Sequence, residues 1–196
     1  MAPALACGNS IVCKPSEMTP LTATALADIL TACGLPKGVF NLVHGLGAEC
    51  GGPLVSHPKV RLVSFTGGTS TGRIVATAAA GSFKKTSLEL GGKNPAVIFA
   101  DCDIDAAVEG VARGCFLNSG QVCLCCPRLL IQKSIFEEFK NRLVEKARAL
   151  KVGDPLSPST FIYHTFFLDP ACLSHKLNNL QFLDANCLPC IYYLSD

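Results

Sequence analysis

Short apolar and β-branched runs alternate with longer helix-like segments over the first 150 residues, and this alternation limits the fold most strongly. Strands are expected at 10–14, 39–43, 61–65, 86–90, 96–99 and 128–132. Between and after them, helices are expected at 19–32, ending at 56, ending at 80, at 103–117 and at 134–150. Strands joined through helices by short glycine-bearing turns pair in parallel. The sequence therefore predicts the α/β class, with a partial doubly wound parallel sheet.

The composition of the chain argues against nucleic acid and membrane as partners. The chain has 49% hydrophobic and 16% charged residues and a net charge of +2, without a run of Lys or Arg. No nucleic-acid partner is expected from this charge pattern. Because no uninterrupted apolar stretch of about 18 residues occurs, and the first residues lack a basic, apolar leader, neither a membrane partner nor a targeting segment is expected.

Twelve cysteines in 196 residues leave two interpretations open. A secreted disulfide scaffold is one, although such scaffolds are usually short and loop-rich. The other is a reduced protein, favoured because Cys13, Cys33, Cys102 and Cys115 lie in apolar periodic segments, where a thiol acts as a small core hydrophobe. A cytoplasmic location is therefore predicted. No metal site is expected.

Two segments combine residue types that carry chemistry. Cys123 follows an expected helix end and Gly120, which suits a left-handed helix cap, so its thiol is predicted on a tight, partly exposed turn. Cys125 and Cys126 are interpreted as bystanders. Glu89 ends an expected strand directly before Gly91 and Gly92. A thiolate attacks carbonyl carbon, and a carboxylate can activate water, so together they suit acyl chemistry.

The segments Leu88-Glu89-Leu90-Gly91-Gly92-Lys93 and Asn118-Ser119-Gly120-Gln121-Val122-Cys123, in this order, resemble the two active-site signatures of the NAD(P)-dependent aldehyde dehydrogenase superfamily. The resemblance implies an enzyme that oxidises a small-molecule aldehyde to a carboxylic acid. It implies that Cys123 is the nucleophile, forming a thiohemiacetal and then a thioester, and that Glu89 activates the deacylating water. The nucleophile loop also resembles that of members related to aminomuconate semialdehyde dehydrogenase.

The same resemblance implies a nicotinamide cofactor. The turn from Phe65 to Gly72 resembles the family's diphosphate turn, with Gly68 in place of a usual serine. The segment after the first strand resembles the one that holds the adenine ribose, and its acidic residue favours NAD over NADP by like charge with a 2′-phosphate. The residues expected to contact the cofactor are Lys14, Glu17, Gly45, Gly67, Gly68, Gly72, Leu90 and Gly91.

Three regions are expected: a partial NAD-binding domain at 1–90, the start of a catalytic domain at 91–160, and a non-homologous tail at 161–196. The tail holds all three Tyr without strand or helix periodicity, so it is expected to pack poorly. Compared with the family, the chain looks truncated at both ends. The resemblance implies homo-oligomers, although the strand that builds the family's dimer is expected to be absent from this chain. The alternative to an enzyme is therefore an inactive fragment that at most binds NAD or a full-length partner.

Overall fold

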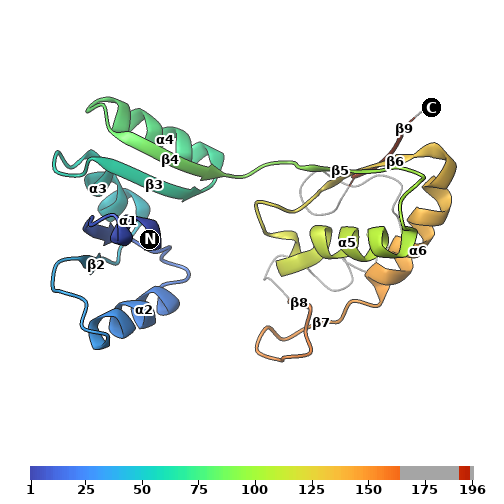
Figure 1. The fold of residues 1–196 in the computed structure, drawn as a ribbon, viewed down its shortest axis with the longest axis horizontal. Helices are drawn as coiled ribbons and strands as arrows, with labels where there is room; N and C mark the ends of the chain where they lie inside the picture. Colours follow the sequence, from blue (N-terminus) through green and yellow to red (C-terminus); the bar gives the residue numbers. More distant parts are fainter. Residues whose placement is uncertain (164–189, 195–196) are drawn as a thin grey trace. The chain divides into compact units, whose positions relative to one another are not determined.

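The computed structural model describes residues 1–163 and 190–194, with backbone alone for residues 163 and 190–194 (Figure 1). The chain divides into two compact units, Met1–Leu90 and Gly91–Asp196. Each unit is considered by itself. Every strand pair in the described residues is parallel. The predicted α/β class with parallel pairing is confirmed.

The first half of unit 1 is one strand–helix–strand segment after a short amino-terminal helix. The helix α1 (Ala2–Ala6) precedes β1 (Ile11–Cys13), α2 (Leu21–Ala32) and β2 (Phe40–Leu42). The strands β1 and β2 pair with Ile11 opposite Phe40. The helix α2 differs from expectation, because Pro20 rather than Thr19 is its N-cap and no side chain caps it.

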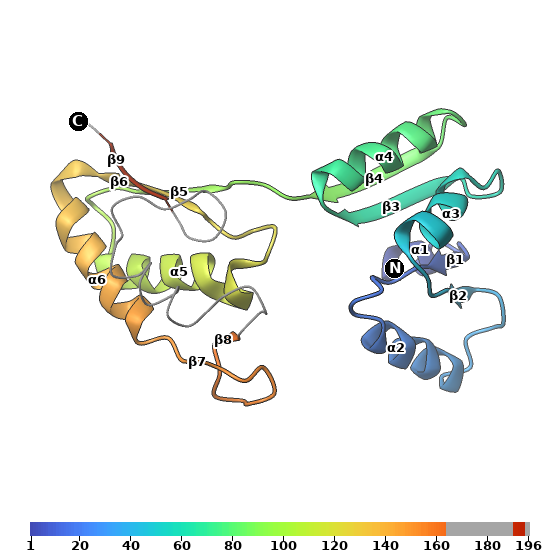
Figure 2. The ribbon, with the colours of Figure 1, turned by 180° about the vertical axis from the view of Figure 1, so that it is seen from behind.

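The second half of unit 1 repeats this plan. A π-helical turn, η1 (Gly47–Gly51), runs into α3 (Gly52–Ser56), followed by β3 (Leu62–Gly67), α4 (Thr69–Ala80) and β4 (Lys85–Leu90). The helix α4 lies along the β3–β4 pair, as Figure 2 shows. It buries one stripe against these strands, formed by Gly72, Val75 and Ala79. This spacing of three and four residues is that of a single helix face.

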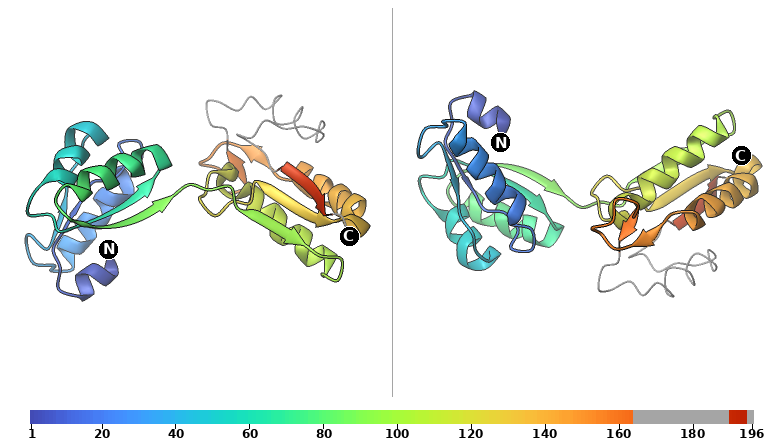
Figure 3. Two further views of the ribbon diagram at one scale, coloured as in Figure 1. Left: turned by 90° about the horizontal axis from the view of Figure 1, so that it is seen from above. Right: turned by 90° about the horizontal axis from the view of Figure 1, so that it is seen from below.

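Unit 2 is built around a three-stranded sheet in the order β5-β6-β9. The strands are β5 (Pro95–Ile98), β6 (Arg128–Gln132) and β9 (Cys190–Leu194), which lie side by side in Figure 3. Between β5 and β6 the chain forms α5 (Ile104–Phe116) and the 3₁₀ segment η2 (Leu117–Gly120). After β6 come η3 (Lys133–Ile135), α6 (Phe136–Arg148), β7 (Val152–Gly153) and β8 (Ile162–Tyr163), of which the last two pair with each other.

The core of unit 2 lies between this sheet and the helices α5 and α6. Leu129 and Ile131 alternate on the buried face of β6, and Phe139 of α6 is buried against them. Their side chains are the largest fully buried ones among the described residues. The helix α5 begins at Asp103, whose carboxylate accepts the N–H of Ala106 at 3.1 Å. Such a cap satisfies one of the amide donors at a helix start.

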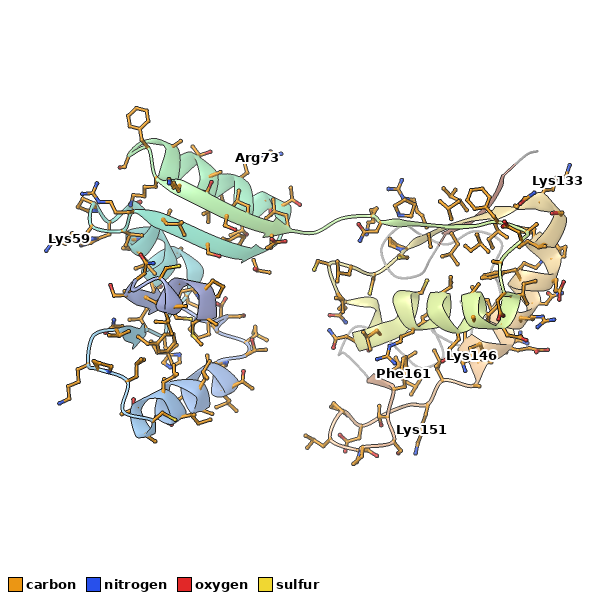
Figure 4. The ribbon with its side chains drawn as sticks, viewed as in Figure 1. Lys59, Arg73, Lys133, Lys146, Lys151 and Phe161 are labelled. Atoms are coloured by element: carbon orange, nitrogen blue, oxygen red, sulfur yellow. The ribbon has the colours of Figure 1, made fainter. Side chains whose placement is uncertain are left out.

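Charged side chains join the outer faces of the two helices. Arg142 of α6 pairs with Asp105 of α5 at 2.5 Å and with Glu138 at 2.6 Å. Lys146, labelled in Figure 4, pairs with Glu109 of α5. These exposed pairs orient the helices but add little stability, since solvent screens them. Burial of the apolar stripes is the main stabilising term.

One expectation needs correction. Cys33 is exposed rather than in a core, because it is the C-cap that follows α2, a helix that buries none of its residues. At the start of the predicted tail, Ile162 is buried and Phe161, labelled in Figure 4, packs against the core of unit 2. The poor packing expected for 161–196 as a whole stays a prediction. In addition, β9 pairs with β6, with Cys190 opposite Arg128. Backbone pairing requires no side-chain periodicity, so the sequence pattern did not reveal this strand. The rest of the predicted tail, 164–189 and 195–196, lies outside the described residues.

Among the described residues, no helix is both long enough and apolar enough to cross a membrane.

Truncation of Phe139 is expected to destabilise unit 2 strongly. Its side chain is 0% exposed, so Phe139→Ala leaves a cavity and should cost about 3–5 kcal/mol of unfolding free energy. Phe83 is 97% exposed and is the matched control, expected to change stability by less than about 0.5 kcal/mol when replaced by Ala. Urea denaturation followed by circular dichroism measures both. Equal losses would contradict the assignment of the core.

Candidate functional site

Cys123 lies on a loop that begins at a strained turn. The helix α5 stops at Phe116, and Asn118, Ser119 and Gly120 then adopt left-handed backbone angles, with φ of 53°, 57° and 75°. Only the glycine was expected there. Asn tolerates this region moderately, but Ser does so rarely, and a non-glycine residue held there costs about 1–3 kcal/mol. Such strain often accompanies a functional turn. The turn reverses the chain into residues 121–127, named here the Cys123 loop.

The inner side of the Cys123 loop is fastened to α5. The N–H of Cys126 donates to the carbonyl of Gly114 at 3.1 Å, and the thiol of Cys115 donates to the carbonyl of Cys126 at 3.1 Å. The buried thiol of Cys125 points to the carbonyl of Leu117 at 3.8 Å. These contacts give Cys115, Cys125 and Cys126 a structural role. The side chain of Cys123 is exposed.

Burial makes Cys115 a poor nucleophile. Desolvation, then the nearby Cys126 and Cys125 thiols, raise the pKa of the Cys115 thiol to about 12. The thiolate is the reactive form, so Cys115 stays neutral and acts as a hydrogen-bond donor. The nine cysteines of residues 1–163 are all free. Of the four thiols around the loop, Cys123 alone is exposed.

The outer side of the Cys123 loop is held by Asn94, which the sequence did not single out. Its side-chain amide donates to the carbonyl of Cys123 at 2.7 Å and to the carbonyl of Cys125 at 3.1 Å. Asn94 stands directly before β5, and the loop runs directly into β6. Because β5 and β6 pair with Pro95 opposite Arg128, the two segments meet at the same edge of the sheet.

Glu89 lies near the carboxyl end of β4 in unit 1. Its neighbours Leu88 and Leu90 are half-buried while Glu89 is exposed, as the alternation of a strand requires. Its position in the parallel ladder is opposite Thr66 of β3. An exposed carboxylate there is available to water. Since Glu89 belongs to unit 1 and Cys123 to unit 2, each is placed only within its own unit.

Three of the predicted cofactor residues come together after β1. The ammonium group of Lys14 lies 3.6 Å from the carboxylate of Glu17 and donates to the carbonyl of Gly45 at 3.2 Å. Gly45 has φ of +154°, and a Cβ there would lie 2.8 Å from the Cβ of Cys50. A side chain at this turn would therefore clash. The cluster presents one ammonium and one carboxylate, a pair able to bind vicinal hydroxyls.

The start of α4 suits an anion. Gly68 is its N-cap, and the first helical hydrogen bond runs from the N–H of Gly72 to the carbonyl of Gly68, at 2.9 Å. The amides of residues 69–71 therefore have no helical acceptor, and no acidic side chain lies in the first turn. Amides of this kind can bind a diphosphate.

At two of the glycines expected to contact the cofactor, packing within unit 1 already leaves no room for a side chain. A Cβ on Gly72 would lie 2.5 Å from a methyl of Leu90, and one on Gly67 would lie 2.5 Å from the ring of Phe65. Gly72 is buried, so it brings α4 close to β4. Gly91, by contrast, has open space around its Cα. The contacts of Gly67, Gly68, Gly72, Leu90 and Gly91 with a cofactor remain predictions.

Comparison with known proteins assigns the family. The model of the aldehyde dehydrogenase family matches residues 1–163, so this chain is a member of the aldehyde dehydrogenase family. It is 52% identical over 161 residues to a protein named 2-aminomuconic 6-semialdehyde dehydrogenase from Pseudomonas sp., covering 82% of this chain and 33% of that one. The chain thus spans about a third of the length of the curated relatives it matches.

Solved structures agree. An NADP-dependent enzyme from E. coli superposes with a TM-score of 0.80 at 43% identity, covering 82% of this chain and 33% of the other. Betaine aldehyde dehydrogenase from Staphylococcus aureus, solved with NAD+, superposes with a TM-score of 0.78 at 42% identity, covering 82% and 32%.

Thiol reactivity should separate Cys123 from Cys115. At pH 8, iodoacetamide is expected to alkylate exposed Cys123 at least about 100-fold faster than Cys115, whose pKa is raised to about 12. Peptide mass spectrometry measures both rates, and urea should make Cys115 reactive as a control. Rapid alkylation of Cys115 in the folded chain would contradict this difference in rates.

The raised pKa of Cys115 also predicts a pH dependence of stability. Because the pKa in the folded chain exceeds the ordinary 9.0, the stability that Cys115 contributes is present below pH 9 and is lost as the pH rises toward 12.

Proposed function

We propose that this chain carries the nucleophile and the base of an NAD-dependent aldehyde dehydrogenase, which oxidises an aldehyde to a carboxylic acid. The observation that carries the proposal is the exposed Cys123 thiol, on a loop fastened on both sides, within the family match. A fastened loop with one exposed sulfur suits a nucleophile, since orientation removes much of the entropy cost of attack.

The residues act in two stages. The thiolate of Cys123 attacks the aldehyde carbon, forming a C–S bond while the carbonyl oxygen takes the electron pair. When bound, the nicotinamide would supply the hydride acceptor, and the carbon on Cys123 would then be at the oxidation level of a thioester. Glu89 then removes a proton from water, whose oxygen attacks the thioester carbon. The C–S bond breaks, the acid departs, and Cys123 returns as a thiolate.

The cofactor fits the polar groups of unit 1. The amide-rich start of α4 would hold the diphosphate, and Lys14 with Glu17 would hold the hydroxyls of the adenine ribose. A 2′-phosphate on that ribose would bring two negative charges close to the Glu17 carboxylate. The side chain of Glu17 is 47% exposed, so solvent weakens this repulsion without removing it. NAD is therefore preferred to NADP.

Semialdehydes are the proposed substrate class. This rests on the 52% identity to a protein named for 2-aminomuconic 6-semialdehyde. The second candidate function is binding of NAD or of a longer relative without turnover. It is favoured by the polar groups of unit 1, namely Lys14 with Glu17 and the free amides at the start of α4, which need no catalytic residue to bind NAD.

The role of Cys123 is tested in a chimera in which this chain replaces the aligned third of the Pseudomonas relative. The chimera should oxidise the semialdehyde, and Cys123→Ala should lower turnover by at least about 10³-fold, since the covalent route is lost. Cys33→Ala is the matched control, because Cys33 is also an exposed, free thiol, and it should retain activity. Full activity with Cys123→Ala would refute the assignment.

The role of Glu89 has a different kinetic signature. In the same chimera, Glu89→Gln should still form the thioester but release acid about 10²–10⁴ times more slowly, because the general base is lost. Rapid mixing should then show a burst of NADH equal to the number of active sites, followed by slow turnover. Glu49, an acidic residue in η1, is the control, and Glu49→Gln should leave the steady rate unchanged. Loss of the burst in Glu89→Gln would mean that Glu89 acts before the thioester forms.

The 196-residue chain by itself separates the two candidate functions. Steady NADH production with a semialdehyde would make this polypeptide an enzyme. NAD binding without NADH production would favour the binding function.

A further inference from the structure

We propose that Asn94 is a positioning residue that fixes the Cys123 loop and lowers the negative potential at its thiol. This rests on the proposed role of Cys123. The amide of Asn94 binds two carbonyls of the loop, those of Cys123 and Cys125, at 2.7 and 3.1 Å. One side chain thus holds the loop on both sides of Leu124, directly at the nucleophile.

The placement of Asn94 is itself determined by neighbouring residues. Asn94 stands directly before Pro95, the first residue of β5, and a proline disfavours helical backbone angles for the residue before it. On the other side, the guanidinium of Arg128 donates through Nε to the carbonyl of Lys93 at 3.0 Å, with a second contact from Nη2. Arg128 is the first residue of β6 and directly follows the Cys123 loop. Asn94 therefore donates to the Cys123 loop, and the residue that follows the loop donates back to Lys93.

Asn94 also affects the electrostatic potential near the Cys123 sulfur, in addition to holding the loop in place. A carbonyl oxygen carries partial negative charge, which opposes a thiolate on the same residue. The side-chain amide brings partial positive charge to that oxygen when it donates. Asn94 is half-buried, so the compensation is screened less than it would be in open solvent. Removing the donor should therefore slow nucleophilic attack by the Cys123 sulfur, and adding a negative charge should slow it more.

The test is the rate of Cys123 alkylation by iodoacetamide in the full 196-residue chain at pH 7. The expected order is wild type and Asn94→Gln fastest, Asn94→Ala about threefold slower, and Asn94→Asp about tenfold slower at low salt. The deficit of Asn94→Asp should shrink in 1 M salt, because screening acts on its full charge. Asp has the shape of Asn but no amide donor, so a role in packing alone predicts a normal rate for this variant.

Asn41 is the matched control. Its amide likewise donates to two carbonyls, those of Ile11 and Gly38, but in unit 1. Asn41→Ala should leave the rate at Cys123 unchanged. Two other thiols report on the fold: exposed Cys33 should react at a constant rate, and buried Cys115 should stay unreactive in every variant. If Asn94→Ala makes Cys115 reactive, that variant disturbs the fold. The proposal is then tested by comparing Asn94→Gln with Asn94→Asp, because both side chains fill the space of Asn94.

An unchanged rate in Asn94→Asp at low salt would overturn the proposal. So would equal rates for Asn94→Gln and Asn94→Asp. The assay contains neither aldehyde nor NAD, so a failure here leaves the proposed dehydrogenase chemistry standing. Conversely, failure of the Cys123→Ala chimera test would not alter the order of alkylation rates.

Discussion

The parallel pairing of β5 with β6 is the constraint on which the rest of unit 2 depends. With Pro95 opposite Arg128, the residues just before each strand meet at one edge of the sheet. Those residues are Lys93 and Asn94 on one side and the Cys123 loop on the other. Burial of Leu129 and Ile131 against the helices holds the register, because a shift by one residue would turn both side chains outward. Burial of these core side chains thus fixes the strand register, and the register fixes where the loop with the exposed Cys123 begins and ends.

The same arrangement sorts the cysteines by function. Cys115 lies on the buried face of α5, where a neutral thiol donates to the backbone of the loop. Cys125 is buried and Cys123 is exposed, and a turn separates them, in which the N–H of Cys125 donates to the carbonyl of Val122 at 2.9 Å. Around the loop, one exposed thiol therefore stands beside three structural ones. Reactivity here follows exposure and local charge, not the number of cysteines.

The sequence predicted the features that arise from local periodicity. The α/β class, the parallel pairing and the strand at Arg128–Gln132 follow from apolar spacing and glycine turns. It could not predict Asn94, since the partners of its amide are backbone carbonyls about thirty residues away, and backbone groups have no sequence signature. The left-handed Ser119 was missed because a serine rarely adopts this backbone region. The strand β9 was missed because edge pairing can recruit a segment without alternation.

Trapping the acyl group tests the central claim most directly. The full chain is mixed with NAD and a semialdehyde, quenched in acid, digested and examined by mass spectrometry. The account predicts that the peptide containing Cys123 gains the mass of the aldehyde less two hydrogens, as a thioester that hydroxylamine removes. The adduct should require NAD and should be absent from the peptides of Cys7, Cys33 and Cys115. An adduct on another cysteine, or none on Cys123 while NADH forms, would contradict the account.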